Sequence, residues 1–157
     1  MDMHGPFIEN EIYTLKTKNG EKCKFKVVSQ IGEGGFGVIY KIFVITPSKG
    51  LSANTYYALK SLGVEVDLDN SEILEELLEE EIEDIKERRL KACQNALGLR
   101  DRQLFDKEIY CLQRVNHYHN TMSILEVLIW RKLKFYIMPL FPSTLYDRLD
   151  EKKISYI

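Results

Sequence analysis

Three glycines near the start of the chain, Gly32, Gly34 and Gly37, have G-x-G-x-x-G spacing. Glycine lets the backbone adopt positive φ and lets a ligand approach closely, because it has no Cβ. A tight glycine turn can therefore point backbone N–H groups at phosphate oxygens. The spacing indicates a phosphate-binding loop, with an ordinary glycine hairpin as the alternative.

A lysine on an apolar segment is the second group that could bind an anion. Alternation along residues 55–62, which read as a strand, places Lys60 on the same face as Tyr56 and Ala58. Burial of an ammonium group without an anionic partner is costly, so Lys60 at this position predicts a nearby anion. The alternative is a lysine at a sheet edge whose charged end reaches solvent.

A glutamate on the apolar side of a predicted helix is a further charged group that needs a partner. Residues 101–116 read as a helix whose apolar residues recur at spacings of 3, 4, 7 and 8, and Glu108 lies on the same side as Leu104, Phe105, Ile109, Leu112 and Val115. A carboxylate on a core-facing side requires a cation. A solvated helix residue is the alternative for Glu108.

The segment after the glycines decides between two kinds of glycine loop. In a Rossmann fold a helix begins directly after the last glycine. Here residues 38–45 are rich in β-branched and aromatic side chains and carry no helix cap, so a strand is predicted. A hairpin over phosphates is therefore favoured over a dinucleotide-binding turn.

Two further hairpins are predicted around this one. Residues 11–17 and 21–31 flank an Asn-Gly pair, which favours a type I′ turn. Residues 122–130 and 133–140 are apolar runs that meet at Arg131-Lys132. Together with the glycine hairpin they predict an antiparallel sheet of about five strands.

An acidic insertion separates the lysine strand from the glutamate helix. Leu74, Leu78, Ile82 and Ile85 recur at helical spacing, Ser71 could cap a helix and Gly98 could end it. A long amphipathic helix is expected within residues 67–99. Its acidic face is either a solvated surface or a docking site for a basic partner.

The bulk composition is that of one soluble globular domain, with 157 residues, 45% apolar and 29% charged. A net charge of −2 does not indicate a nucleic-acid or membrane partner. Three widely spaced cysteines suggest neither a disulfide framework nor a zinc site, and they fit an intracellular, cytoplasmic location. His117 and His119, two residues apart in a turn, are poor zinc ligands without a third.

The motifs, in their order along the chain, resemble those of the N-terminal lobe of eukaryotic-type protein kinases of the serine/threonine kind. The similar segments are the glycine loop, Ala58-Leu59-Lys60, the Glu108 helix, and the strand and hinge that end at Phe141. The resemblance implies an α+β fold with one packed helix plus the inserted acidic helix. It implies a leading hairpin in residues 1–24, a nucleotide-binding lobe in 25–141, and the hinge exit with the start of a lower-lobe helix in 142–157.

The resemblance also implies an ATP site. The glycine loop would cover the phosphates, Lys60 would bind the α- and β-phosphates while paired with Glu108, and Met138 would line the adenine pocket as gatekeeper. The Pro139 carbonyl and the Phe141 amide would hydrogen-bond the adenine. The residues implied to bind ATP are Ile31, Gly32, Glu33, Gly34, Gly35, Phe36, Gly37, Ile39, Ala58, Lys60, Glu108, Met138, Pro139 and Phe141.

Phosphoryl transfer requires parts that these 157 residues do not contain. Neither H-R-D-x-x-x-x-N, which supplies the catalytic Asp of the family, nor D-F-G, which supplies a Mg²⁺ ligand, occurs in the sequence. The expectation is an ATP-binding lobe, inactive alone, whose Mg²⁺ is held only together with a second lobe. The alternative is a non-catalytic, kinase-derived module that contacts a protein partner.

Overall fold

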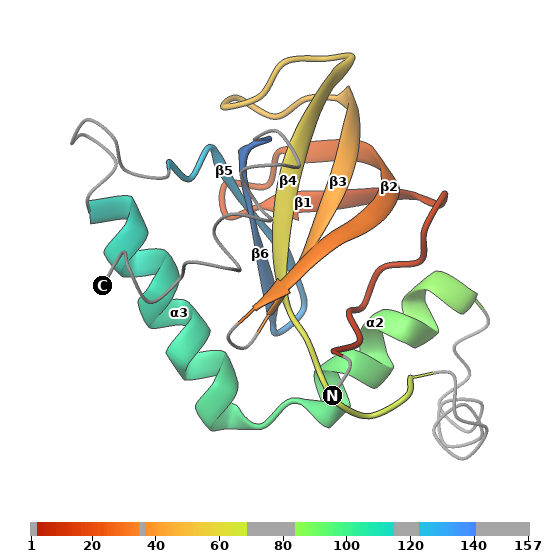
Figure 1. Cartoon of the computed structure of the whole chain (residues 1–157). Coiled ribbons are helices and arrows are strands. Elements are labelled where there is room, and N and C mark those ends of the chain that lie inside the picture. The colour runs from red at the N-terminus through yellow and green to blue at the C-terminus, as the bar shows by residue number, and fades with distance from the viewer. Residues whose placement is uncertain (1–2, 35–36, 69–83, 115–122, 141–157) are drawn as a thin grey trace.

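In the part of the chain that the structure describes, a six-stranded antiparallel barrel has two helices beside it (Figure 1). The computed structural model describes residues 3–34, 37–68, 84–114 and 123–140. The strands follow the order β1-β2-β3-β4-β6-β5, and β1 pairs with β5 to close the barrel. They are β1 (Ile12–Thr17), β2 (Lys22–Gly34), β3 (Gly37–Thr46), β4 (Thr55–Leu62), β5 (Glu126–Trp130) and β6 (Leu133–Pro139).

The α+β class and the antiparallel pairing agree with the sequence, but the expected sheet of about five strands is wrong. The sheet has six strands and closes on itself. Closure comes from the end of the leading hairpin, where Lys16 pairs with Ile129 and Thr17 with Leu128. Because this contact joins segments more than a hundred residues apart, no local pattern in the sequence signals it.

The turn between β1 and β2 also differs from the expected type I′ turn, which needs positive φ at both central residues. Gly20 has φ of +83°, but Asn19 is not among the described residues with positive φ. The Gly20 amide donates to the Thr17 carbonyl at 3.0 Å, and the Thr17 hydroxyl accepts from the amides of Asn19 and Glu21. The buried Thr17 side chain therefore stabilises a longer turn with one left-handed glycine.

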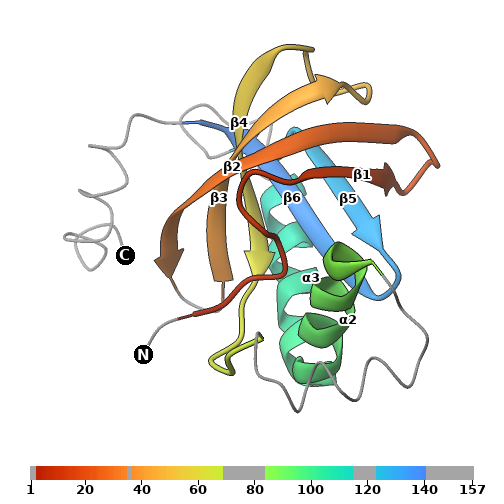
Figure 2. The ribbon, with the colours of Figure 1, turned by 90° about the vertical axis from the view of Figure 1, so that its right-hand side faces the viewer.

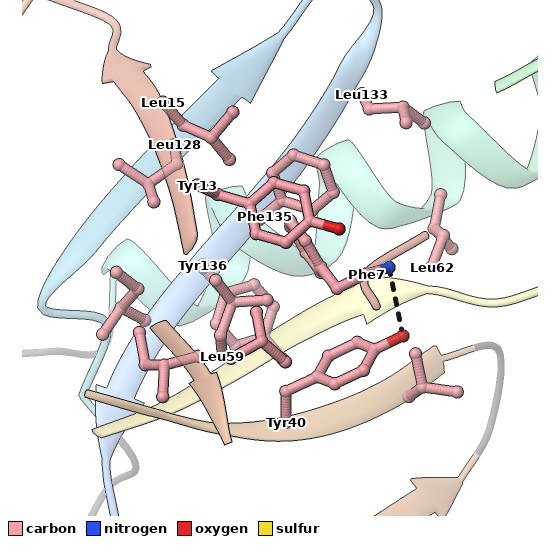
Figure 3. Packing of buried hydrophobic residues seen from close by; sticks show 14 of the residues in the cluster. Phe7, Tyr13, Leu15, Tyr40, Leu59, Leu62, Leu128, Leu133, Phe135 and Tyr136 are labelled. Carbon is pink, nitrogen blue, oxygen red and sulfur yellow. Dashed lines mark hydrogen bonds between the residues drawn. The ribbon is translucent and has the colours of Figure 1, made fainter. Parts of the chain in front are cut away.

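Aromatic side chains fill the barrel around Phe7, which precedes the first strand (Figure 3). The ring of Phe7 lies 4.8 Å from Tyr13 and 4.9 Å from Phe135, and 5.4 Å from Tyr40 in an edge-on arrangement. Its backbone amide donates to the Tyr40 hydroxyl at 3.4 Å. Strict alternation in β1 directs Tyr13 inward to this cluster, as period-2 patterning requires. The segment before β1 is thus part of the core.

Helix α2 (Ile85–Ala96) lies beside the barrel end that also carries the N-terminal segment (Figure 2). Asp84 precedes it in an extended conformation, and its carboxylate accepts from the Lys86 amide as an N-cap. A helix running without interruption from Ser71 to Gly98 is therefore wrong, because Asp84 begins a new helix. Residues 69–83, which carry most of the acidic side chains of the insertion, lie outside the described residues.

Helix α3 (Leu99–Arg114) lies next to β6 and carries the predicted carboxylate (Figure 1). Phe105 and Ile109 are buried, as the apolar spacing predicted, while Leu104 is 37% exposed. Val115, His117 and His119 lie outside the described residues. Within the parts of the chain that the structure describes, no helix has the length and apolar character needed to cross a membrane.

Candidate functional site

The glycine segment is the far end of a long hairpin. Strands β2 and β3 pair antiparallel from Lys24–Thr46 down to Gly34–Gly37, and the two residues between these glycines, Gly35 and Phe36, lie outside the described residues. Strand β3 begins at Gly37 itself. The hairpin prediction is confirmed, and the Rossmann arrangement, which needs a helix here, is contradicted.

Close packing leaves no room for a side chain at Gly37, the last glycine of the motif. A Cβ atom at this position would lie 2.7 Å from the Ser61 carbonyl oxygen and 2.9 Å from Cε of Lys60. At Gly32 the nearest atoms to such a Cβ belong to Ile39, at 4.0 Å, which is ordinary contact. The absence of a side chain at Gly37 thus leaves the space in which the stem of Lys60 lies.

Lys60 and Glu108 form an ion pair between β4 and α3. The Lys60 Nζ atom lies 3.0 Å from Oε1 and 3.2 Å from Oε2 of Glu108. The side chains are 17% and 38% exposed, so neither is free in solvent. Each is therefore the counter-ion of the other, as the sequence resemblance implied, and the solvated alternatives do not describe this structure.

Tyr136 on β6 adds a second donor to the same carboxylate. Its hydroxyl donates to Oε2 of Glu108 at 3.2 Å, and it is the cross-strand partner of Lys60. Its ring stacks on Phe105 at 5.6 Å. Burial raises the pKa of Tyr136, and the negative charge of Glu108 and the hydrogen bond to it raise that pKa further. The hydroxyl therefore remains a protonated donor.

Sequence reasoning missed Tyr136. In the structure Ala58 on β4 is the register partner of Met138 on β6, and this register places Tyr136 opposite Lys60. No pattern within either strand fixes the register between them, so the sequence carried no local signal for Tyr136.

A cavity of about 370 Å³ opens next to the ion pair. Apolar side chains form most of its wall, Lys107 adds a second ammonium group, and the exposed thiol of Cys111 lies at the lining. Its residues are Gly37, Lys60, Leu62, Leu104, Phe105, Lys107, Glu108 and Cys111. Of these, Leu62, Leu104, Phe105, Lys107 and Cys111 were not predicted as site residues.

The other predicted residues that the structure describes are not among those lining this cavity. Ala58 and Met138 pair between β4 and β6 and are 0% and 1% exposed, while Pro139 is Tyr57's partner at the end of β6. Ile31 and Ile39 are partly buried against the core. Gly32 and Gly34 lie on β2, Phe141 lies outside the described residues, and the exposed Glu33 accepts a hydrogen bond from the Met3 amide at 2.9 Å.

The chemistry available at this position is the binding of an anion. The cavity contains two ammonium groups and one carboxylate, and its apolar walls strengthen charge interactions relative to water. Among the described residues, no group of three or more His, Cys, Asp or Glu side chains could hold a metal ion. No known family model matches the sequence, and no curated protein matches it.

Proposed function

We propose that this chain binds ATP as the N-terminal lobe of a protein kinase and holds the phosphates at Lys60. The observation that supports the proposal is the ion pair in which Lys60 Nζ lies 3.0 Å from Glu108 Oε1. Together with a second lobe that supplies the catalytic Asp and the Mg²⁺ ligands, the protein would transfer the γ-phosphoryl group of ATP to serine or threonine hydroxyls of proteins.

The ion pair prepares Lys60 for this role in two ways. The carboxylate fixes the direction of the ammonium group, so less conformational freedom is lost when a phosphate binds. An ammonium group has three N–H donors, so a phosphate oxygen can bind while Glu108 remains paired. Charge-assisted hydrogen bonds of this kind are about twice as strong as neutral ones.

The remaining parts of the proposal follow from the sequence resemblance. The β2–β3 hairpin would cover the phosphates with its glycines, and Ile31, Ile39, Ala58 and Met138 would contact the adenine. Mg²⁺ would accompany ATP and take its protein ligands from the second lobe. Adenine would therefore reach Ala58 and Met138 only after the groups that cover them move aside, because both residues are buried in the structure.

A non-catalytic protein-binding module is the second candidate, and one observation favours it. Helix α3 leaves the side chains of Leu99, Leu104 and Tyr110 exposed by 62%, 37% and 59%, and a protein partner would cover such apolar side chains. A module of this kind would keep the fold without using Lys60. It predicts that the chain does not bind ATP.

Titration calorimetry of the 157-residue chain with ATP and Mg²⁺ tests the proposal. Loss of hydrogen bonds to a charged group should weaken ATP binding by roughly ten- to a hundredfold in Lys60→Met. Lys41→Met is the matched control, because Lys41 lies on β3 outside the cavity with its Nζ atom 4.7 Å from the Tyr56 ring. Equal ATP affinity of Lys60→Met and the unaltered chain would refute the assignment.

A further inference from the structure

Helix α3 is attached to the barrel beside Tyr136 by contacts from two of its turns. Phe105 stacks on the Tyr136 ring with an interplanar angle of 22°, and Glu108, three residues later, accepts from the Tyr136 hydroxyl. Residues three apart on a helix lie on the same face, so both contacts act on one side of α3. Tyr136 itself is 2% exposed and fixed within β6.

A further polar link between α3 and the barrel, described for Lys134 and Asp106, is weak. Lys134 and Asp106 form an ion pair of 3.2 Å, but their side chains are 34% and 49% exposed. Ion pairs that are this exposed contribute little, because water screens the charges and two flexible side chains must be ordered. The orientation of Glu108 therefore depends mainly on the contacts that Lys60 and Tyr136 make with it.

We infer that Tyr136 is a positioning residue that holds the Glu108 carboxylate against Lys60, so that the phosphate-binding pair assembles within this chain without a partner that pushes α3 into place. The inference rests on the proposed function, since it concerns the regulation of the same site. Lys60 and Tyr136 are cross-strand neighbours on β4 and β6, so the barrel presents two fixed donors to one carboxylate.

Removal of the hydroxyl would release one of these donors. Glu108 is 38% exposed on its side chain, so its carboxylate could rotate toward water once Oε2 lost the Tyr136 donor. Lys60 would then lose the counter-ion that directs it. The conformation in which Lys60 and Glu108 are paired would then be one of several conformations. The apparent affinity for ATP would fall in proportion to the population of the paired conformation.

Tyr136→Phe tests this inference because it removes the hydroxyl and keeps the ring that stacks on Phe105. We expect ATP binding to weaken roughly five- to twentyfold, as for loss of one hydrogen bond to a charged group. Tyr40→Phe is the matched control, since it also removes a buried hydroxyl that has one hydrogen bond, but it lies away from the cavity. It should leave the ATP affinity unchanged.

A double-mutant cycle separates positioning from a general loss of stability. If Tyr136 acts through Glu108, Tyr136→Phe should have no further effect on ATP affinity in the Glu108→Ala chain. Equal losses in both backgrounds, or unchanged affinity of Tyr136→Phe in a chain that binds ATP, would overturn the inference. Thermal unfolding of each variant checks that the chain remains folded.

Hydrogen exchange without nucleotide gives a readout that does not depend on ATP binding. We expect the amides of α3 to exchange faster in Tyr136→Phe while the β3 and β4 amides keep their protection, a pattern that Tyr40→Phe should not show. If the unaltered chain fails to bind ATP, the proposed function fails, and this exchange pattern alone decides the inference. If the protection of the α3 amides relative to the β3 and β4 amides is unchanged in Tyr136→Phe, the inference is refuted, even where the variant is less stable overall.

Discussion

Lys60 and Glu108 lie 48 residues apart in the sequence, and their side chains meet at 3.0 Å. The pair joins strand β4 to helix α3, so it links the barrel to the helix as well as lining the cavity. Its two members have different surroundings: Glu108 has a second donor in Tyr136, whereas Glu108 provides the one ion pair described for Lys60.

This difference predicts unequal effects of removing the two charges. In Lys60→Met the Glu108 carboxylate keeps the Tyr136 donor and partial exposure, so the free energy of unfolding should change by less than about 1 kcal/mol. In Glu108→Ala a largely buried ammonium group loses its counter-ion, which should cost about 1–3 kcal/mol. Urea unfolding of both variants measures the difference. A larger loss of unfolding free energy in Lys60→Met than in Glu108→Ala would contradict this prediction.

Gly37 should tolerate a side chain poorly. In Gly37→Ala the new methyl group would meet the Ser61 carbonyl oxygen, a backbone atom, and the stem of Lys60. The β3–β4 pairing and the Lys60 side chain must then shift, which should lower the free energy of unfolding by about 1–3 kcal/mol and weaken ATP binding. Gly32→Ala is the control for the free energy of unfolding, since its methyl group meets nothing closer than 4.0 Å. Similar losses in the two variants would contradict the prediction.

Phe7 should be essential to the barrel although it precedes the first strand. The ring is 2% exposed and contacts four aromatic rings, so Phe7→Ala would leave a cavity at the centre of the core. We expect a loss of about 3–5 kcal/mol in the free energy of unfolding. Ile12→Ala, at a side chain that is 40% exposed, should cost far less. Chemical denaturation measures both, and a loss below about 1 kcal/mol for Phe7→Ala would refute its role.

Tyr13 should make the fold sensitive to alkali. Burial raises the pKa of Tyr13 from 10.0 to about 12, so above pH 10 the unfolded chain releases a proton that the folded chain keeps. The stability that comes from the neutral phenol is complete below pH 10 and is lost as the pH rises to about 12. A shift of this size corresponds to roughly 2–3 kcal/mol.

Tyr13→Phe isolates that contribution. At pH 8 the variant should be less stable by about 1 kcal/mol, because the Tyr13 hydroxyl accepts a hydrogen bond from the Ile8 amide at 2.9 Å. Between pH 10 and 12 this deficit should shrink or reverse, since phenylalanine cannot ionise. Urea unfolding at several pH values measures the trend, with Tyr110→Phe, at an exposed tyrosine, as control. A deficit that stays constant with pH would contradict it.

Local patterns in the sequence were sufficient for most elements. The 55–62 strand has the predicted bounds, and the Arg131-Lys132 turn joins two strands as predicted. The glycine hairpin and the Glu108 helix also formed where alternation and helical spacing indicated. The cost of burying a charge predicted that Lys60 needs an anion and Glu108 a cation, whereas the pairing of these two residues with each other came from the kinase resemblance.

The features that were missed depend on contacts between distant segments or on a competing local interaction. The β1–β5 pairing that closes the barrel and the register that puts Tyr136 beside Lys60 arise when the sheet assembles. The turn at Gly20 depends on the Thr17 hydroxyl, and the start of α2 on the Asp84 carboxylate. Each of these two oxygens satisfies backbone amides in a way that helix or turn propensities do not include.

The pairing of β1 with β5 spans only two residues of each strand, Lys16 and Thr17 with Leu128 and Ile129, whereas β3 and β4 pair along eight. We therefore expect the barrel to open first between β1 and β5. If these two strands separated, their unpaired backbone amides and carbonyls could bond to a neighbouring molecule, whereas in the closed barrel they bond to each other. We therefore expect the tendency of this protein to self-associate to depend on the stability of the pairing between these four residues.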